Sequence, residues 1–297
     1  MNLEILNLAN QYIKEDGLHK TYIEGFSLFK SSVSTPKVST ICDLSLIIVL
    51  QGKTTGYLGK NIFQYNSKNY LVIPTSLALE YEIKSTKEEP FLAIFHKIDK
   101  NLMYEVIDLI RDKNIQECKE CGLGLFSDEV TPRVEDTIKR ILETMKSKVE
   151  ANILGSSLLR ELYYGIAMGG NAHFLHKIFL KNTFEAKMTR TLKTIHETYH
   201  EHLDVQTLAK NEDMSPSSFH THFKSVTSMT PLQYIKKIRL TKAMDLLSKE
   251  NFQVKETAYA IGYESSFHFS KDFKRYYGIP PKEVKSNLIQ ANIAFGF

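Results

Sequence analysis

The sequence lacks the features that usually mark a secreted, membrane-spanning or disulfide-stabilised protein. Its 297 residues include only three cysteines, too few for a disulfide framework, so free thiols in a reducing compartment are expected. The N-terminal segment has no basic stretch followed by an apolar core, so we expect no secretory signal. The longest apolar run, Leu44 to Leu50, is far shorter than the roughly 20 residues that cross a bilayer. These absences favour a cytoplasmic protein without a membrane partner.

The motifs of common enzymes are also missing. We find no glycine-rich phosphate-binding loop and no convincing nucleophile constellation. Cys118 and Cys121 form a Cys-Lys-Glu-Cys pair, but one such pair without a second is insufficient for a structural zinc site. We therefore expect no catalytic residue, no metal and no cofactor, and we keep thiol sensing at Cys118 and Cys121 as an alternative.

The C-terminal part of the chain contains the same sequence pattern twice. The two copies match at an offset of 50 residues, with Ser215 over Ser265 and Phe219 over Phe269. A repeat of this fidelity in residue type and spacing indicates two copies of one structural unit. Further matches at the same offset are Phe223 with Phe273, Lys224 with Lys274, and Pro231 with Pro281.

Each copy predicts a short helix, a tight turn and a second helix. Ala209 and Ala258 match at an offset of 49, so one residue has been gained or lost in the turn that follows. The serine that opens the second helix is a good N-cap, and Pro216 fits the first helical position. The two phenylalanines four residues apart share one face, and Gly262 suits the turn. The pattern is a helix-turn-helix, made twice.

A longer helix is predicted between the copies, from Pro231 to about Lys249. Roughly 18 residues at about 1.5 Å each make a rod of about 27 Å. One turn of B-DNA is on the order of 34 Å long and separates successive major-groove faces. A rigid spacer of this length would therefore let one chain place both second helices in adjacent grooves.

The basic residues are concentrated in the same region. From Lys187 to Ser286 there are 16 Lys or Arg against 11 Asp or Glu, whereas the rest of the chain has 22 against 23. A cationic surplus favours binding to a phosphate backbone. The alternative is an ordinary solvated surface, because the surplus is small.

This region resembles the AraC/XylS-type transcriptional regulators, through the stretches LAKNEDMSPSSFHTHFKSVTSMTPLQYIKKIRLTKAMDLL and VKETAYAIGYESSFHFSKDFKRYYGIPP. The resemblance implies promoter DNA and RNA polymerase as partners and activation as the mode, while the residues themselves leave the sign of regulation open. It also implies that the outward positions of both second helices face the major groove. The DNA-contacting candidates are Ser217, His220, Thr221, Lys224, Ser266, Phe267, Ser270, Lys271 and Lys274.

Several of these assignments have alternatives. Each candidate can instead be an exposed position that touches only water or phosphate. Phe267 is expected either to pack on a thymine methyl or to complete the core beside Phe269. Lys274 is expected at phosphate, with Arg275 and Lys282. Arg239 matches a family position on the linker helix and is expected in a structural ion pair or at DNA.

The N-terminal part shows many short runs of β-branched and aromatic residues from Tyr22 to about Ile98, which predict a sandwich or small barrel. Gln51-Gly52-Lys53 and Glu89-Pro90-Phe91-Leu92-Ala93 are among the pieces similar to the cupin-type regulatory domain of one AraC branch. Its scarcity of histidines argues against a cupin enzyme. Candidate effector-binding residues for a small molecule are Phe29, Phe63, Tyr65, Tyr81 and His96. The alternative is that these side chains simply fill the barrel as core.

Between these parts the chain turns helical. Val134, Ile138, Ile141, Met145 and Val149 form a stripe on one face, and we interpret it as a dimer surface rather than as packing on the barrel. The predicted fold is α+β, with a cupin-like β-barrel, a helical connector and an all-α double helix-turn-helix. The expected domains are a regulatory domain at 1–130, a connector that supports a homodimer at 131–182, and a DNA-binding domain at 183–297. The alternative to a small effector is control by a partner protein or by thiol chemistry.

Overall fold

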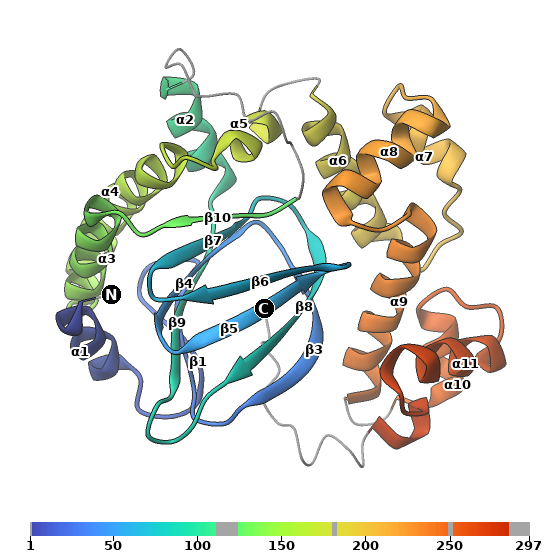
Figure 1. Cartoon of the computed structure of the whole chain (residues 1–297), viewed down its shortest axis with the longest axis horizontal. Coiled ribbons are helices and arrows are strands. Elements are labelled where there is room, and N and C mark those ends of the chain that lie inside the picture. Colours follow the sequence, from blue (N-terminus) through green and yellow to red (C-terminus); the bar gives the residue numbers. More distant parts are fainter. Residues whose placement is uncertain (1, 111–123, 180–182, 249–251, 285–297) are drawn as a thin grey trace.

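The computed structural model describes residues 2–110, 124–179, 183–248 and 252–284, and its N-terminal half is built around two sheets (Figure 1). A six-stranded sheet has the order β1-β2-β9-β4-β7-β10, and a four-stranded sheet has the order β3-β8-β5-β6. The strands are β1 Gly17–Lys20, β2 Phe26–Ser31, β3 Thr35–Cys42, β4 Ser45–Gln51, β5 Lys53–Leu58, β6 Asn61–Asn66, β7 Asn69–Ile73, β8 Leu77–Lys84, β9 Phe91–Lys97 and β10 Phe126–Glu129.

The six-stranded sheet is covered on both faces, which explains why its strands are so apolar. In β9, Phe91, Ala93 and Phe95 belong to the core inside the barrel. The alternate residues Leu92 and Ile94 belong to a second core, between the sheet and a layer of helices. Because successive side chains point to opposite faces, a strand covered on both sides is nearly continuously hydrophobic.

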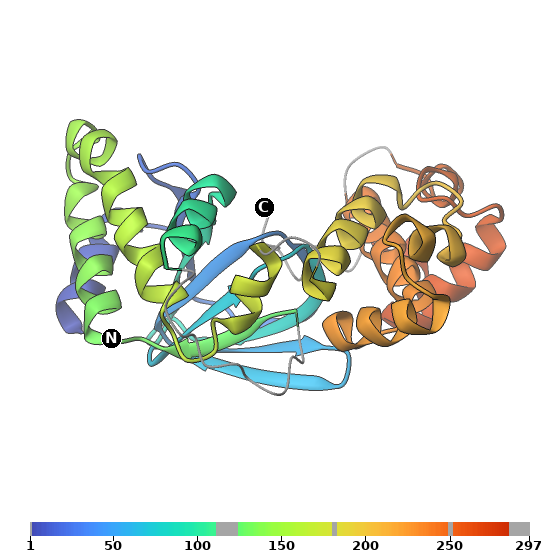
Figure 2. The same ribbon diagram turned by 90° about the horizontal axis from the view of Figure 1, so that it is seen from above.

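Five helices contribute to a layer on the outer face of the six-stranded sheet, and α1, α3 and α4 lie at the end of the molecule away from the C-terminal helices (Figure 2). Their apolar faces complete the second core, so this layer is part of the same packed body as the sheet. They are α1 Leu3–Tyr12, α2 Lys100–Ile110, α3 Pro132–Thr144, α4 Lys148–Ala167 and α5 His173–Phe179.

The prediction that the apolar stripe at Val134 to Val149 forms a dimer surface is wrong. Val134, Ile138, Ile141 and Met145 are buried in the core of their own chain, where α3 packs against α1 and α4. The stripe also does not continue, because α3 ends at Thr144 and a new helix begins after it. Amphipathic periodicity gives the buried face of a helix but not the surface that buries it.

The C-terminal helices form two helix-turn-helix units, as the fold class predicted. The first consists of α7 and α8, the second of α10 and α11, and α9 joins them (Figure 1). Within the described residues, no helix is long and apolar enough to span a membrane. The helices are α6 Phe184–Thr198, α7 Val205–Asn211, α8 Pro216–Thr227, α9 Pro231–Ser248, α10 Val254–Ala260 and α11 Ser266–Tyr277, followed by a 3₁₀ turn, η1, at Pro281–Glu283.

The packing joins the first helix-turn-helix to the barrel and leaves the second with a core of its own. The core inside the barrel continues into Phe219 and Phe223 of α8 and into the first half of α9. The second half of α9 packs instead with Phe269 and Phe273 of α11. The linker helix therefore belongs to both cores, one at each end.

Candidate nucleic-acid interface

The second helix of each unit begins where the repeat predicts. The hydroxyl oxygens of Ser215 and Ser265 accept hydrogen bonds from the backbone N–H groups of Ser218 and His268, at 3.2 and 3.5 Å. Each serine thus satisfies a donor that a helix start leaves unpaired. The matched phenylalanines are fully buried and hold each helix by one face. The opposite face of each helix remains for contact with a ligand.

On α8, the four predicted positions are all exposed: Ser217, His220, Thr221 and Lys224. The Thr221 hydroxyl donates to the Ser217 carbonyl oxygen at 3.1 Å, so its oxygen can still accept a hydrogen bond. The His220 imidazole can donate or accept at a base edge, and the Lys224 ammonium can reach guanine or phosphate. The structure therefore gathers these side chains on one polar helical face.

The corresponding face of α11 is mixed in character. Lys271 and Lys274 are exposed, whereas Ser266 and Ser270 are half-buried and joined by a 2.8 Å hydrogen bond from the Ser270 hydroxyl. Phe267 is 72% exposed, so the expectation that it completes the core beside Phe269 is wrong. An aromatic ring held in solvent on such a face suits an apolar base group such as the thymine methyl.

Arg239 has a structural role that differs from both of its predicted ones. Its guanidinium donates to the carbonyl oxygens of Tyr199 and Glu201, at 2.7 and 2.8 Å. These carbonyls lie just past the end of α6, where backbone acceptors lack helical partners. Burial lowers the pKa of Arg239, with nearby Tyr263 opposing the shift. The arginine therefore ties α9 to the end of α6.

His222, to which the sequence assigns no role, packs against the start of α6. Its ring stacks on that of Phe184, with centroids 3.8 Å apart and planes 11° apart. A second tie missed by the sequence is the ion pair between Lys236 of α9 and Asp272 of α11. Both contacts join helices distant in sequence, and a periodic pattern contains no signal for either.

A groove of about 690 Å³ lies between the segment that follows α6, the linker helix α9 and the second helix-turn-helix unit, on the side of α9 that carries Lys236 and Arg239. Its charged groups are largely engaged, because Lys236 and Arg275 both pair with Asp272. The Tyr263 hydroxyl is a third partner of the same carboxylate, at 3.2 Å. The groove therefore belongs to the junction of the second unit with α9 and the segment after α6, beside the start of α11.

Four of the five effector candidates lie on the inner side of the barrel wall. Phe29, Tyr65 and Tyr81 are buried in the core inside the barrel, and Phe63 is half-buried against it. The rings of Phe63 and Tyr65 stack with centroids 6.3 Å apart. The Tyr65 hydroxyl is buried without a hydrogen-bond partner among the described residues, and burial raises its pKa.

His96 lies on the opposite side of the sheet, facing α4. Its Nε2 is 2.6 Å from the Tyr163 hydroxyl, which accepts a hydrogen bond from the Asp99 backbone N–H at 2.8 Å. Burial lowers the pKa of His96 to about 4, although Gly25 and Asp99 oppose that shift. This residue therefore does not share a site with the four inner candidates.

Of the three cysteines, Cys42 lies in the part of the chain that the structure describes. Cys42 is buried, and burial raises the pKa of its thiol to about 12, with Asp43 adding to the effect. A thiol held in the protonated form is a poor nucleophile. Cys118 and Cys121 lie outside the described residues. Within the described residues, no three His, Cys, Asp or Glu side chains are grouped so that they could hold a metal.

Comparison with protein families places these features in a known group. The profile of the AraC-type transcriptional regulator N-terminus matches residues 22–174, more than half of the chain. This chain belongs to the AraC-type transcriptional regulators. A helix-turn-helix domain profile matches residues 208–287, which include both units. The family is one of transcriptional regulators, and the helix-turn-helix match lies in the C-terminal helices of this chain.

Curated relatives match only part of their own length. The transcriptional activator RhaS of Salmonella schwarzengrund is 30% identical over 101 residues, which cover 34% of this chain and 36% of RhaS. The regulator YobQ of Bacillus subtilis is 27% identical over 134 residues, which cover 44% of this chain and 56% of YobQ. The matched stretches thus span between about a third and somewhat over half of these relatives.

Among solved structures, ToxT of Vibrio cholerae shares the overall fold. An apo variant covers 90% of this chain and 99% of its own, with a TM-score of 0.57 at 12% identity. A ToxT structure with bound unsaturated fatty acid covers 91% and 96%, with a TM-score of 0.53 at 12% identity. At this identity the likeness concerns the fold alone.

Proposed function

We propose that a single chain reads DNA with both α8 and α11, one in each of two adjacent major grooves. The observation that carries this proposal is the pair of equivalent helices, each held by buried phenylalanines, joined by an 18-residue helix. At about 1.5 Å per residue, α9 is about 27 Å long. Side chains that can hydrogen-bond to base edges stand on the free face of each helix.

The roles within this surface follow from side-chain chemistry. His220 and Thr221 of α8 and Lys271 of α11 contact base edges, and Ser217, Ser266, Ser270 and Lys224 support them at bases or phosphates. Phe267 packs on a thymine methyl. Lys274, near the end of α11, binds phosphate and positions the helix without reading sequence. RNA polymerase at the promoter is the expected partner in transcription, in the cytoplasm.

Substitution of one reading residue in each helix tests these roles. We expect His220→Ala and Lys271→Ala each to relax sequence preference at one part of the site, at a cost of about 1 to 3 kcal/mol for the preferred base. Lys274→Ala is the matched control, because loss of a phosphate contact weakens binding uniformly across sequences. Selection of binding sites from random DNA measures all three. A uniform loss for His220→Ala and Lys271→Ala would reduce both to phosphate contacts.

We further propose that a small, mostly apolar effector enters the barrel and shifts the population of DNA-binding states. The buried Tyr65 hydroxyl supports this, because a lone unpaired polar group in an apolar interior is costly and a ligand acceptor would satisfy it. Phe29, Phe63 and Tyr81 would contact the apolar body of such a ligand. The fatty acid bound by ToxT, a protein of the same fold, is a ligand of this kind.

Control by a partner protein is the second candidate, and exposed apolar residues on α4 favour a second copy of the chain as that partner. Val149 and Ile153, four residues apart, are 66% and 67% exposed. A metabolite panel, including fatty acids, that changes neither melting temperature nor DNA affinity would contradict effector control. A change of promoter affinity with protein concentration would then favour the homodimer.

A further inference from the structure

The barrel holds the two helix-turn-helix units in different ways. It shares a hydrophobic core with the first unit, and this contact also has backbone hydrogen bonds, such as Gly124 N–H to the Val226 carbonyl at 2.9 Å. On α9, the Tyr234 hydroxyl accepts from the Ala78 N–H at 3.1 Å. The second unit has a separate core, so its attachment to the barrel depends more on contacts between individual side chains.

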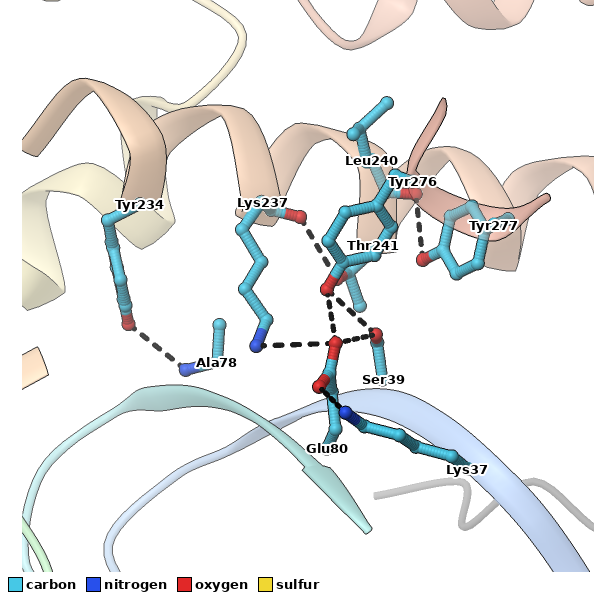
Figure 3. A network of polar contacts seen from close by, with 10 residues as sticks. All are labelled: Lys37, Ser39, Ala78, Glu80, Tyr234, Lys237, Leu240, Thr241, Tyr276 and Tyr277. Carbon is cyan, nitrogen blue, oxygen red and sulfur yellow. Dashed lines mark hydrogen bonds and ion pairs between the residues drawn. The ribbon is translucent and has the colours of Figure 1, made fainter. Parts of the chain in front are cut away.

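Those side-chain contacts converge on Glu80 of β8 (Figure 3). The Tyr276 hydroxyl, in the last turn of α11, lies 2.7 Å from a carboxylate oxygen of Glu80 and donates to it. Lys37 of β3 is 2.8 Å from the other carboxylate oxygen, and Lys237 of α9 is 3.8 Å from the first. Ser39 of β3 is 3.1 Å from the same Tyr276 hydroxyl. The Glu80 carboxylate thus connects strands β3 and β8 with the linker helix α9 and with α11, the second of the two helices proposed to read DNA.

The charges in this cluster depend on one another. Lys237 is 4% exposed, and burial lowers its pKa while Glu80 opposes the shift. Burial also disfavours the charged form of Glu80, but Lys237, Lys37 and Tyr276 together hold its pKa below the ordinary value. A buried ion pair contributes little net stability, since desolvation offsets the attraction, but it penalises any arrangement that separates the charges. The cluster therefore specifies one position of α9 and α11 relative to β3 and β8.

The cluster contacts α11 on the face opposite to the one proposed to read DNA. Tyr276 comes two residues after Lys274, about 200° further round the helix, so it lies on the side away from the proposed reading face. Lys271 and Lys274 remain exposed while Tyr276 is engaged. The contact can therefore position the helix without covering the surface that meets DNA.

We propose that Glu80, with Lys37, Ser39, Lys237 and Tyr276, is the joint through which the barrel sets the orientation of the second reading helix. The joint holds α11 in the orientation that the second major groove requires. Less conformational entropy is therefore lost when DNA binds. Any change in the barrel that moves β3 or β8 reaches α11 through this carboxylate. The inference rests on the proposed function, in which α11 reads the second groove.

Tyr276→Phe is the mildest test, because it removes one hydroxyl and leaves every charge of the cluster in place. Affinities are measured by fluorescence anisotropy on a duplex selected in vitro with the unmodified full chain, and on two derivatives with either half of the site scrambled. We expect about fivefold weaker binding to the intact duplex, the size of effect typical of one lost hydrogen bond. We expect no change on the duplex that keeps only the half read by α8.

Tyr263→Phe is the matched control. Its hydroxyl also bonds to a carboxylate, that of Asp272, but both residues belong to the second unit, and the bond does not reach the barrel. This variant should bind all three duplexes within about twofold of the unmodified chain, as expected for a weak 3.2 Å contact.

The double variant Glu80→Gln with Lys237→Met breaks the joint without leaving a buried lysine unpaired. Its melting temperature shows whether it is folded, and its loss should again be confined to the duplexes that contain the half read by α11. Unchanged or tighter binding by both joint variants, or equal losses on all duplexes, would overturn the joint. If scrambling the second half does not weaken the unmodified chain, it is the reading role of α11 that fails, and the proposed function with it.

Discussion

His96 stands where the six-stranded sheet meets α4, and its surroundings make the stability of the N-terminal half depend on pH. The side chain is 1% exposed and packs between the rings of Phe26 and Tyr163, at centroid distances of 5.7 and 5.6 Å. The Tyr163 hydroxyl already accepts from the Asp99 N–H, so it can donate to Nε2 of a neutral imidazole. The folded state thus favours the uncharged ring.

The direction of the pH effect follows from the lowered pKa. In the unfolded chain His96 binds a proton near its ordinary pKa of about 6.5, whereas in the folded protein burial lowers the pKa to about 4. The unfolded state therefore binds more protons between these values, and the free energy of unfolding falls as the pH drops from about 6.5 to about 4. The contribution is on the order of 3 kcal/mol and is fully present above pH 6.5.

Urea unfolding of the wild type and of His96→Gln at several pH values measures this contribution. Burial also lowers the pKa of His196 to about 4, so this residue adds the same pH dependence to the stability of both proteins. The relevant quantity is therefore the difference between the two plots of unfolding free energy against pH. We expect the variant to lose less stability on acidification. Parallel curves would show that His96 does not contribute.

Single residues were predictable where their role depends on local sequence. The N-cap serines and the inward phenylalanines followed from spacing alone, because a helix fixes which positions share a face. The contacts of Arg239 and His222 were not predictable, since their partners, Tyr199 just after α6 and Phe184 at its start, are set by tertiary packing. For Phe267 the sequence left two alternatives, an exposed position at DNA or the core beside Phe269, and hydrophobicity could not choose between them.

At the scale of elements, the turn between α10 and α11 requires glycine for two reasons. Gly262 has a φ of +83°, which disfavours any side chain, and an added Cβ would lie 2.4 Å from the His200 carbonyl oxygen. In the first unit the corresponding turn is one residue shorter, and Asp213 takes the positive φ of 52°. The single-residue difference inferred from the repeat does fall in this turn.

Gly262→Ala should therefore destabilise the protein more than an alanine placed at another glycine of similar backbone conformation. Gly278 has a φ of +79° with no atom within 4 Å of an added Cβ, which makes it the matched control. We expect a loss of about 1 kcal/mol for Gly278→Ala and roughly 2 to 4 kcal/mol for Gly262→Ala. Chemical denaturation measures both. Equal losses would mean that the close approach to His200 relaxes freely.

The elements themselves were largely predictable, and their partners were not. The apolar run from Leu44 to Leu50 overlaps β4, and the linker helix expected from Pro231 to about Lys249 is observed over Pro231–Ser248. The α3 stripe was assigned to the wrong partner because an apolar face packs equally well on a sheet of its own chain or on a second subunit.

At the scale of the molecule, the main feature is that one hydrophobic core joins the barrel to α8, while polar side chains at Glu80 connect the barrel to α11. The double helix-turn-helix and the barrel class were predictable from repeats and strand spacing. Their mode of attachment was not, since it depends on residues such as Tyr234 and Tyr276 whose partners lie more than 150 positions away.

The central claim is that one subunit places two helices on successive turns of the duplex. Hydroxyl-radical footprinting of the full chain on its selected site, at a concentration where one chain binds each duplex, tests it most directly. We expect two protected patches on one face of the DNA, centred about 10 base pairs apart. A single protected patch covering no more than half a turn for each subunit would contradict it.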